Sequence, residues 1–497
     1  MLRSGQRLVH RVSAMAQVPS NPLVVVLGAT GTGKSKLAVD LALRFNGEII
    51  NGDAMQLYSG LPIITNKVTE EEKQGVQHHL LGCIGLDEPT WTVGQFVPKA
   101  LGAINEIRAK GKLPILVGGT HYYTQSLLFR DRLADDAIEV ETSEDARQNW
   151  PILQEPTSII LEKLREVDPV MADRWHPNDR RKIQRSLEIW LKTGKPASQV
   201  YDEQRAKKTS GQGDNFVAEA TSDYSSEPLM LFPTLLLWVY AEPEKLRNRL
   251  DSRVDTMLSN GLLSEVASLS NFLRSRETEG HSVDRTRGIW VSIGFKEFEQ
   301  YQEALESDRA KANDLKKLED IAIEQTKIAT RQYAKRQLTW IRIKLLHALR
   351  EARGQGSLFV LNGSDLEKWE TSVTEIATDL TRKFLGGESL PDPQSLSSIG
   401  QDLLIPKKEY DLSQRRDLWE RRYCAACDMT AVTENEWNQH IQSRRHRKVA
   451  AAIAKREKQN TDSQQNRSNN DTVADEIKTI NQPTVGEDGT KSCLLPE

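Results

Sequence analysis

The glycine-rich stretch after the first apolar run constrains the fold of this chain more than any other feature. Apolar residues 23–27 lead directly into it and a pattern of helical period follows, which is the context that the pattern G-x-x-x-x-G-K-S requires. In that context backbone N–H groups cradle an anion, the lysine adds a positive charge, and the serine hydroxyl can hold Mg²⁺. The stretch is Gly28, Ala29, Thr30, Gly31, Thr32, Gly33, Lys34 and Ser35.

This loop predicts an α/β core with a parallel sheet and a site for a di- or triphosphate, from a nucleotide or from another diphosphate ester. Residues 48–50 are the next predicted strand, and Asp53 follows them. That position faces the crevice at the carboxyl edge of a parallel sheet, where ligands bind. A chemical role and a turn-capping role are equally compatible with Asp53 there.

The strand predicted at 113–117 ends in Gly118-Gly119, where an NTP-hydrolysing enzyme places an aspartate for Mg²⁺. The apolar runs at 158–161 and 235–239 do not end in aspartate either. This absence favours a small-molecule kinase or a diphosphate-using transferase over ATP hydrolysis.

Length and composition exclude several other classes of protein. A chain of 497 residues exceeds one core and predicts two to four units. Its net charge of −3 provides no overall basic field, so a nucleic-acid surface must be local. No apolar run is long enough for a membrane span, and four cysteines are too few for a disulfide scaffold. We therefore expect no membrane partner and a reducing compartment.

Residues 1–22 differ from the rest of the chain. Arg3, Arg7 and Arg11 recur at helical spacing, and no acidic residue precedes Asp40. This composition is typical of a mitochondrial transit peptide, with a disordered leader as the alternative. Translation starting at Met15 would yield a second product that localises to another compartment.

The middle of the chain is predicted to alternate between core and inserted segments. The core comprises 23–130 and 231–385, a helical insertion spans 131–202, and a flexible loop spans 203–230. A helix at 178–193 in the insertion presents a polar edge. In the core, a long helix is predicted at 316–349. Its segment 331–342 carries four cations with an interleaved tyrosine and tryptophan, which suits RNA and is equally common in a solvated basic face.

The C-terminal region contains a metal-binding pattern. Residues 386–412 are predicted as a linker, 413–458 as a zinc finger with a basic extension, and 459–497 as a disordered tail. The ligands Cys424, Cys427, His440 and His446 have the spacing of a closed tetrahedral Zn²⁺ site, the two histidines lying on one continuous helix. Zinc is predicted to be structural, and the basic extension indicates nucleic-acid binding or a nuclear address.

Over about 23–450 the chain resembles the tRNA dimethylallyltransferases, also called tRNA isopentenyltransferases, and in particular their eukaryotic branch. The resemblance depends on the phosphate loop, the zinc finger and motifs at 53–58, 64–67, 117–123, 176–179, 292–298 and 331–340. It implies a P-loop NTPase-like core, a helical insertion domain and a C-terminal C2H2-type finger of the U1/matrin kind.

The resemblance also implies a reaction, in which the dimethylallyl group of dimethylallyl diphosphate moves to N6 of the adenine 3′ to the anticodon, and diphosphate is released. Asp53 matches the catalytic base of the family. Lys34, Arg253 and Mg²⁺ at Ser35 would neutralise the leaving diphosphate, which the whole loop binds. The positions that match tRNA contacts are Asp53, Ala54, Met55, Gln56, Thr120, Gln184, Arg185, Arg331, Lys335 and Arg336.

The chain departs from the family at Ala54, where serine is usual, and in the length of the loop at 203–228. We expect a monomer in mitochondrion and cytoplasm, with the nucleus as a further address. The alternatives are a P-loop small-molecule kinase and a non-catalytic RNA-binding protein whose loop senses nucleotide. The zinc finger and the basic aromatic helix argue against the kinase, because a metabolite kinase needs neither.

Overall fold

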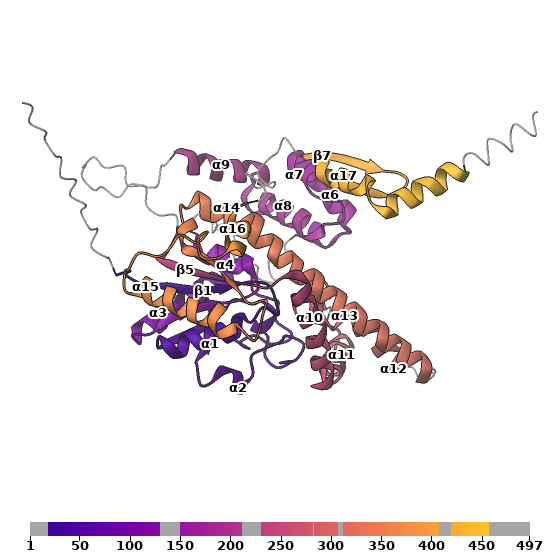
Figure 1. Cartoon of the computed structure of the whole chain (residues 1–497). Coiled ribbons are helices and arrows are strands. Elements are labelled where there is room, and N and C mark those ends of the chain that lie inside the picture. Colours follow the sequence, from indigo (N-terminus) through magenta and orange to yellow (C-terminus); the bar gives the residue numbers. More distant parts are fainter. Residues whose placement is uncertain are drawn as a thin grey trace, which may run out of the picture. The chain divides into compact units, whose positions relative to one another are not determined.

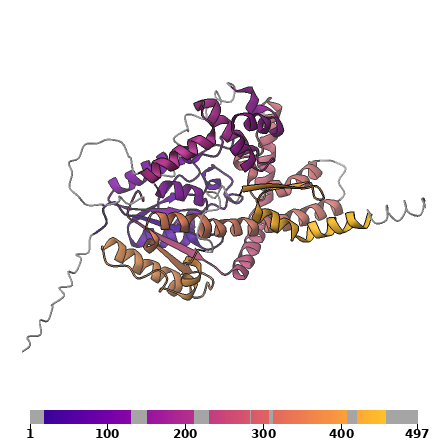
Figure 2. The same ribbon diagram turned by 90° about the horizontal axis from the view of Figure 1, so that it is seen from above.

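The computed structural model describes residues 18–129, 150–210, 230–281, 283–306, 312–406 and 419–456 (Figure 1; seen from above in Figure 2). These residues divide between two compact units, one formed by 1–142 with 203–414 and the other by 143–202 with 415–497. Residues 1–17 of the leader predicted at 1–22, residues 131–149 of the predicted insertion, most of the loop at 203–230 and the tail predicted at 459–497 lie outside the described residues. No described helix combines the length and apolar character needed to cross a membrane.

A six-stranded parallel sheet organises the first unit, with strand order β3-β2-β4-β1-β5-β6. Both faces of the sheet are buried, because odd residues of β1 pack into one apolar cluster and even residues into another. This is the reason why its strands are apolar without alternation. The strands are β1 Leu23–Leu27, β2 Gly47–Asn51, β3 His78–His79, β4 Leu113–Val117, β5 Thr234–Tyr240 and β6 Leu358–Asn362.

Helices cover both faces of this sheet (Figure 1). On one side α1 Lys34–Arg44 and α15 Glu375–Leu385 share a core with the even residues of β1, and on the other α3 Val93–Ala109 and α4 His121–Leu128 pack on the odd residues. The remaining helices of the first unit are α2 Glu70–Lys73, α10 Pro243–Ser259, α11 Leu262–Thr278, α12 Glu299–Glu306, α13 Ala312–Trp340, α14 Leu346–Glu351 and α16 Ser398–Leu404.

The predicted long helix at 316–349 is three segments in succession. Helix α13 ends at Trp340, a π-helical turn spans Ile341–Leu345, and α14 follows. An extra residue in a π turn rotates the faces of the helix on its two sides, and such turns often occur at functional sites.

The predictions for two irregular segments are wrong in part. The linker at 386–412 contains α16, because Leu403 is buried in the main core and the Ser397 hydroxyl accepts the Gly400 N–H at the helix start. The predicted start of the loop at residue 203 is too early, because helix α9 spans Ala197–Ser210. The helix is anchored where Ala197 and Val200 are buried, and it continues through residues of high helix propensity. Composition alone conceals the anchoring contacts in both cases.

The second unit combines a helical segment with the finger. The apolar run at 158–161 lies inside α6 and is not a strand, whereas the helix predicted at 178–193 is confirmed as α8. Its elements are α6 Thr157–Val167, α7 Pro169–Arg174, α8 Arg180–Thr193, the first residues of α9, β7 Trp419–Cys424, β8 Met429–Thr433 and α17 Glu434–Ile441.

A buried carboxylate supports the outer part of the sheet. Glu48 of β2 is 3% exposed and accepts hydrogen bonds from His79 Nε2 at 2.7 Å, Lys112 Nζ at 2.8 Å and Lys110 Nζ at 3.2 Å. Burial acts to raise the pKa of Glu48, but the bonds from Lys112, His79 and Lys110 outweigh it and lower the pKa to about 2.

We expect Glu48→Gln to lower the free energy of unfolding by about 1–3 kcal/mol, because it removes the charge that three hydrogen-bond donors share. The loss stays in this range because the two lysines are partly exposed and can be rehydrated. The wild-type contribution is fully present above the ordinary pKa of about 4.5 and is lost as the pH falls through about 2. Urea titrations of both proteins between pH 2 and 7 measure it. Glu106→Gln removes the exposed partner of Lys110 and is the control, with a nearly unchanged midpoint. Equal stabilities of the Glu48 variant and wild type at pH 7 would contradict the expectation.

Candidate active site

The phosphate loop has a shape that only glycine permits at two of its positions. Gly28 and Gly33 have φ angles of 147° and 89°. A Cβ at Gly28 would lie 2.3 Å from the Val239 carbonyl oxygen, and one at Gly33 would lie 2.4 Å from the Trp369 ring. The loop therefore passes tightly between β5 and Trp369 before α1 begins at Lys34, as the motif predicts.

Two cations meet at this loop. Lys34 Nζ donates to the Ala29 carbonyl at 2.7 Å, and Arg253 Nη1 of α10 donates to Thr30 Oγ1 at 2.8 Å. Burial lowers the pKa of Lys34 to about 8, with Arg253 acting in the same direction and Asp53 against it. Thr32 is buried and its hydroxyl donates to the same carbonyl at 2.9 Å, so this side chain shapes the loop, whereas Ser35 is exposed.

Asp53 is held at the end of β2. The Asn51 amide donates to the Asp53 carbonyl at 3.0 Å and accepts the Asp53 N–H at 3.0 Å, while Oδ1 of Asp53 accepts the Met55 N–H at 3.0 Å. Burial raises the pKa of Asp53, and the Met55 N–H and the Lys34 charge oppose that rise. The turn-capping role of Asp53 is confirmed, and its chemical role stays a prediction, which is compatible with the cap because the same carboxylate also interacts with Lys34.

The ends of β2 and β4 are tied together beside Asp53. Ala54 donates its N–H to Thr120 Oγ1 at 3.0 Å, and Gly52 donates to the Val117 carbonyl at 2.7 Å. Tyr333 of α13 hydrogen-bonds Thr120, and burial raises its pKa. The backbone at Ala54 is therefore fixed by the hydroxyl of Thr120, although residue 54 has no hydroxyl of its own.

The predicted RNA contacts fall into two groups. In the first unit, Lys335 and Arg336 are exposed on α13, whereas Arg331 is paired with Asp251 at 2.7 Å and with Glu324 at 2.8 Å. Also in this unit, Met55 packs against the main core and Gln56 donates to the Asn66 carbonyl at 2.8 Å.

Gln184 and Arg185 belong to the second unit and have partners within it. Gln184 Nε2 donates to the Leu153 carbonyl at 2.6 Å, and Arg185 pairs with Glu188 at 3.3 Å. Both side chains help to hold the helical segment together, in addition to any contact with RNA.

One face of α13 and its π turn forms an open groove. Trp340 is oriented within it by a hydrogen bond from Nε1 to Gln125 Oε1 of 3.1 Å and by an edge contact with Tyr122 at 5.9 Å between ring centroids. A basic groove with a fixed indole suits phosphates and bases. Its lining consists of Gln332, Lys335, Arg336, Thr339, Trp340, Ile343 and Lys344.

Two buried residues of the site were not singled out from the sequence. In the sequence Gln337 directly follows Lys335 and Arg336, and the cations and aromatic residues of this segment determined its interpretation. In the structure its amide contacts both the phosphate loop and the end of β4. His121 starts α4 and is 4% exposed, and neither ring nitrogen has a hydrogen-bond partner among the described residues. Burial and the Lys34 charge lower its pKa to about 3, so the ring is neutral. For His121 a signal existed, because it directly follows Gly-Gly-Thr at a strand end.

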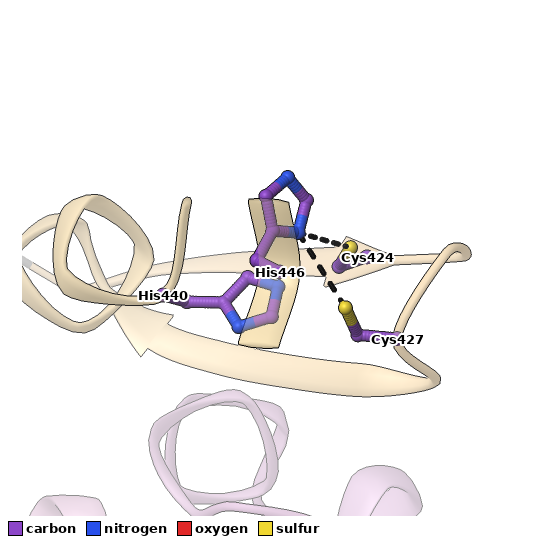
Figure 3. A group of neighbouring side chains, drawn as sticks. All are labelled: Cys424, Cys427, His440 and His446. Carbon is purple, nitrogen blue, oxygen red and sulfur yellow. Dashed lines mark hydrogen bonds between the residues drawn. The ribbon is translucent and has the colours of Figure 1, made fainter. Parts of the chain in front are cut away.

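The finger brings its four predicted ligands together (Figure 3). Their ligand atoms lie within 4.8 Å of one another, and His446 Nδ1 is 3.5 Å from both sulfur atoms. His440 Nε2 is buried without a partner among the described residues. Two thiolates, two imidazoles and this spacing fit a tetrahedral Zn²⁺ site.

The prediction that one helix carries both histidines is wrong. Helix α17 ends at Ile441, residues 442–443 form a turn, and 444–456 are helical again. The Ser443 hydroxyl accepts the His446 N–H at 3.1 Å, as at the start of a helix. The break gives His446 its own approach to the cysteines.

A parallel sheet with this phosphate loop, a partly buried carboxylate at a neighbouring strand end and a basic helix define a P-loop enzyme that acts on a phosphate or diphosphate ester. Residues 56–344 match the family described as IPP transferase, and residues 421–447 match the family described as zinc-finger double-stranded RNA-binding. The chain belongs to the IPP transferase family.

Relatives match along nearly the whole chain. It is 38% identical to the tRNA dimethylallyltransferase of Schizosaccharomyces pombe, with 86% of this chain and 94% of that protein covered. It is 33% identical to the tRNA dimethylallyltransferase of Homo sapiens, with 86% and 85% covered. A crystal structure of a eukaryotic dimethylallyltransferase acting on tRNA is similar with a TM-score of 0.67 and 32% identity, covering 89% of this chain and 99% of that one.

Proposed function

We propose that this chain transfers the dimethylallyl group of dimethylallyl diphosphate to N6 of the adenine 3′ to the anticodon of tRNA, releasing diphosphate. The observation that carries the proposal is that a partly buried carboxylate, Asp53, interacts with two cations at the phosphate loop, Lys34 at the start of α1 and Arg253 of α10. A prenyl transfer to an amine requires both, namely a base for the amine proton and positive charge for the departing diphosphate.

The loop would bind the diphosphate through its backbone N–H groups and Lys34. Arg253, whose Nε is buried with no hydrogen-bond partner among the described residues, has a donor to spare for the same anion. As the allylic C–O bond breaks, charge accumulates on the diphosphate, and these fixed cations stabilise it more than they stabilise the intact donor.

Asp53 would accept a hydrogen bond from the adenine N6 amine and take its proton as the new C–N bond forms. Its raised pKa makes it a stronger base than an exposed aspartate, while the Lys34 charge opposes protonation. The target base must leave its stack to reach Asp53, which is only partly exposed at the end of β2. The groove along α13 supplies cations for the surrounding phosphates.

Mg²⁺ fits the loop at Ser35. The hydroxyl is exposed at the first turn of α1, and Mg²⁺ characteristically combines one such ligand with substrate phosphate oxygens and water. When bound there it would supply further positive charge to the diphosphate.

The direct test incubates the purified full chain with labelled dimethylallyl diphosphate, Mg²⁺ and unmodified tRNA. We expect label on tRNA carrying adenine 3′ to the anticodon and none on a matched tRNA with guanine there. ATP turnover without transfer would overturn the proposal in favour of the kinase. Binding of tRNA with neither activity would favour the non-catalytic alternative.

We expect kcat/KM for the donor to fall as the pH rises through about 8, because this parameter follows the enzyme before the donor binds, and neutral Lys34 loses its attraction for diphosphate. Initial rates between pH 6 and 10 at saturating tRNA measure it. Lys34→Arg should be slower and lose this dependence, because arginine stays charged. Lys36→Met, which alters the exposed neighbour paired with Asp40, is the control. A flat wild-type profile would contradict the assignment of Lys34.

We also propose that the protein is monomeric and that it localises to the mitochondrion and the cytoplasm, with a further fraction in the nucleus. Three arginines at helical spacing in 1–22 and the basic residues 444–448 support the addresses. A fluorescent fusion of residues 1–22 that stays in the cytosol would remove the mitochondrial address. Light scattering of the purified chain measures the oligomeric state.

A further inference from the structure

One buried amide joins the two halves of the site. Gln337 of α13 is 4% exposed, and both ends of its side chain are used. Oε1 accepts the Thr30 N–H of the phosphate loop at 2.7 Å, and Nε2 donates to the Gly119 carbonyl after β4 at 2.8 Å. The side chain therefore spans two segments that are each more than two hundred residues away in sequence.

The contact at Gly119 continues to Asp53. Gly119 lies against the Asp53 carboxylate, whose pKa its N–H helps to lower, so Asp53 and Gln337 both contact the same glycine. A Cβ at Gly119 would lie 2.3 Å from Gln337 Nε2 and 3.1 Å from Asp53 Oδ2. These contacts form a continuous series from the phosphate loop through Gln337 and Gly119 to the carboxylate of Asp53.

The helix that carries Gln337 is itself anchored. Tyr333, one turn earlier, hydrogen-bonds both Thr120 and Gln337. Two further anchors are Arg331 to Asp251 at 2.7 Å and Lys327 to Asp255 at 2.6 Å, which hold α13 on α10. The amide is thus preorganised, because its helix cannot shift without breaking these contacts.

We propose that Gln337 is a positioning residue that sets the separation between the phosphate loop and Asp53. This inference rests on the proposed function. The allylic carbon is held by the loop and the attacking amine by Asp53, so their approach depends on how the two segments are spaced. A displacement of about 1 Å in such an arrangement can lower the rate by about 100-fold.

A purely structural role is the competing explanation, because any buried amide must satisfy its hydrogen bonds. The two roles differ in what they affect. Loss of a structural contact lowers the folded fraction and the total activity together. Loss of a positioning contact lowers kcat in folded protein and leaves the KM for tRNA unchanged.

The test compares Gln337→Leu and Gln337→Glu with wild type and with Gln302→Leu, which alters a buried glutamine of α12. Activities are normalised to the folded fraction from circular dichroism. For Gln337→Leu we expect kcat to fall about 100-fold, with the KM for tRNA within about two-fold. Calorimetry with Mg²⁺ and inorganic diphosphate should show an affinity lowered by less than about five-fold, because Lys34 and Arg253 remain. The control should match wild type in all three measurements.

Gln337→Glu supplies a second readout, which tests how close the side chain of residue 337 lies to Asp53. Glutamate can still accept the Thr30 N–H, but it opposes the Gly119 carbonyl and adds a negative charge on the route to Asp53. The acidic limb of its kcat–pH profile should therefore move to higher pH than in wild type, because a like charge raises the pKa of a carboxyl group.

A folded Gln337→Leu protein with kcat within three-fold of wild type would overturn the inference. So would an unmoved acidic limb in Gln337→Glu. Absence of transfer by the wild type would instead overturn the proposed function, and the inference with it. The two failures are distinguishable because only the second appears before any variant is made.

Discussion

Asp53→Ala is expected to remove prenyl transfer while leaving tRNA affinity within a few-fold of wild type. Proton acceptance by a positioned carboxylate contributes about 10²–10⁴ in rate, and an aromatic amine is a poor nucleophile without it. Asp53 is one partly buried side chain that interacts with Lys34, so little of the RNA-binding surface changes when it is lost. Single-turnover transfer and filter binding measure the two quantities separately.

The same variant has a second expected effect. The Asp53 charge raises the pKa of Lys34, so Asp53→Ala should move any residual alkaline limb to lower pH than about 8. Asp53→Asn keeps an oxygen that can accept the Met55 N–H, so it separates loss of the base from collapse of the turn. Asp87→Ala, at an exposed aspartate, is the control. Near-normal turnover in either Asp53 variant would remove this residue from the role of base.

Cys424→Ser is expected to unfold the finger and weaken tRNA binding without stopping chemistry. Zinc binding to comparable peptides contributes about 10–16 kcal/mol of apparent free energy at neutral pH, which such a small module cannot replace. Losing the basic surface that the finger carries should also flatten the dependence of the tRNA dissociation constant on salt. At saturating tRNA the rate should persist, because Asp53, Lys34 and Arg253 lie in the other unit.

Zinc content and dissociation constants at several salt concentrations measure this expectation. Cys83→Ser, at an exposed cysteine of the first unit, makes the same chemical change outside the metal site and should alter neither. Deletion of 413–458 should reproduce the effect of Cys424→Ser. A salt dependence identical to wild type in both would leave the finger without a role in tRNA binding.

Local sequence predicted those parts of the fold that depend on neighbours along the chain. The strands at 23–27 and 113–117 and the helix that follows the phosphate loop are confirmed, because apolar runs and periodicity reflect burial directly. The finger ligands are confirmed for the same reason, since metal spacing is local. Helix α16 and the continuation of α9 were missed, because their anchors lie in distant segments or are masked by polar composition.

The sequence by itself determined the anion-binding loop, the parallel sheet and the four metal ligands, because each is specified by residue type at short spacing. Only the tertiary structure decided that Arg253 meets Thr30 across 223 residues, that Arg331 is paired with Asp251, and that Gln337 joins the loop to the glycine beside Asp53. Such contacts depend on which helix packs over which strand end. That packing follows from the burial of both sheet faces as a whole and not from any one segment.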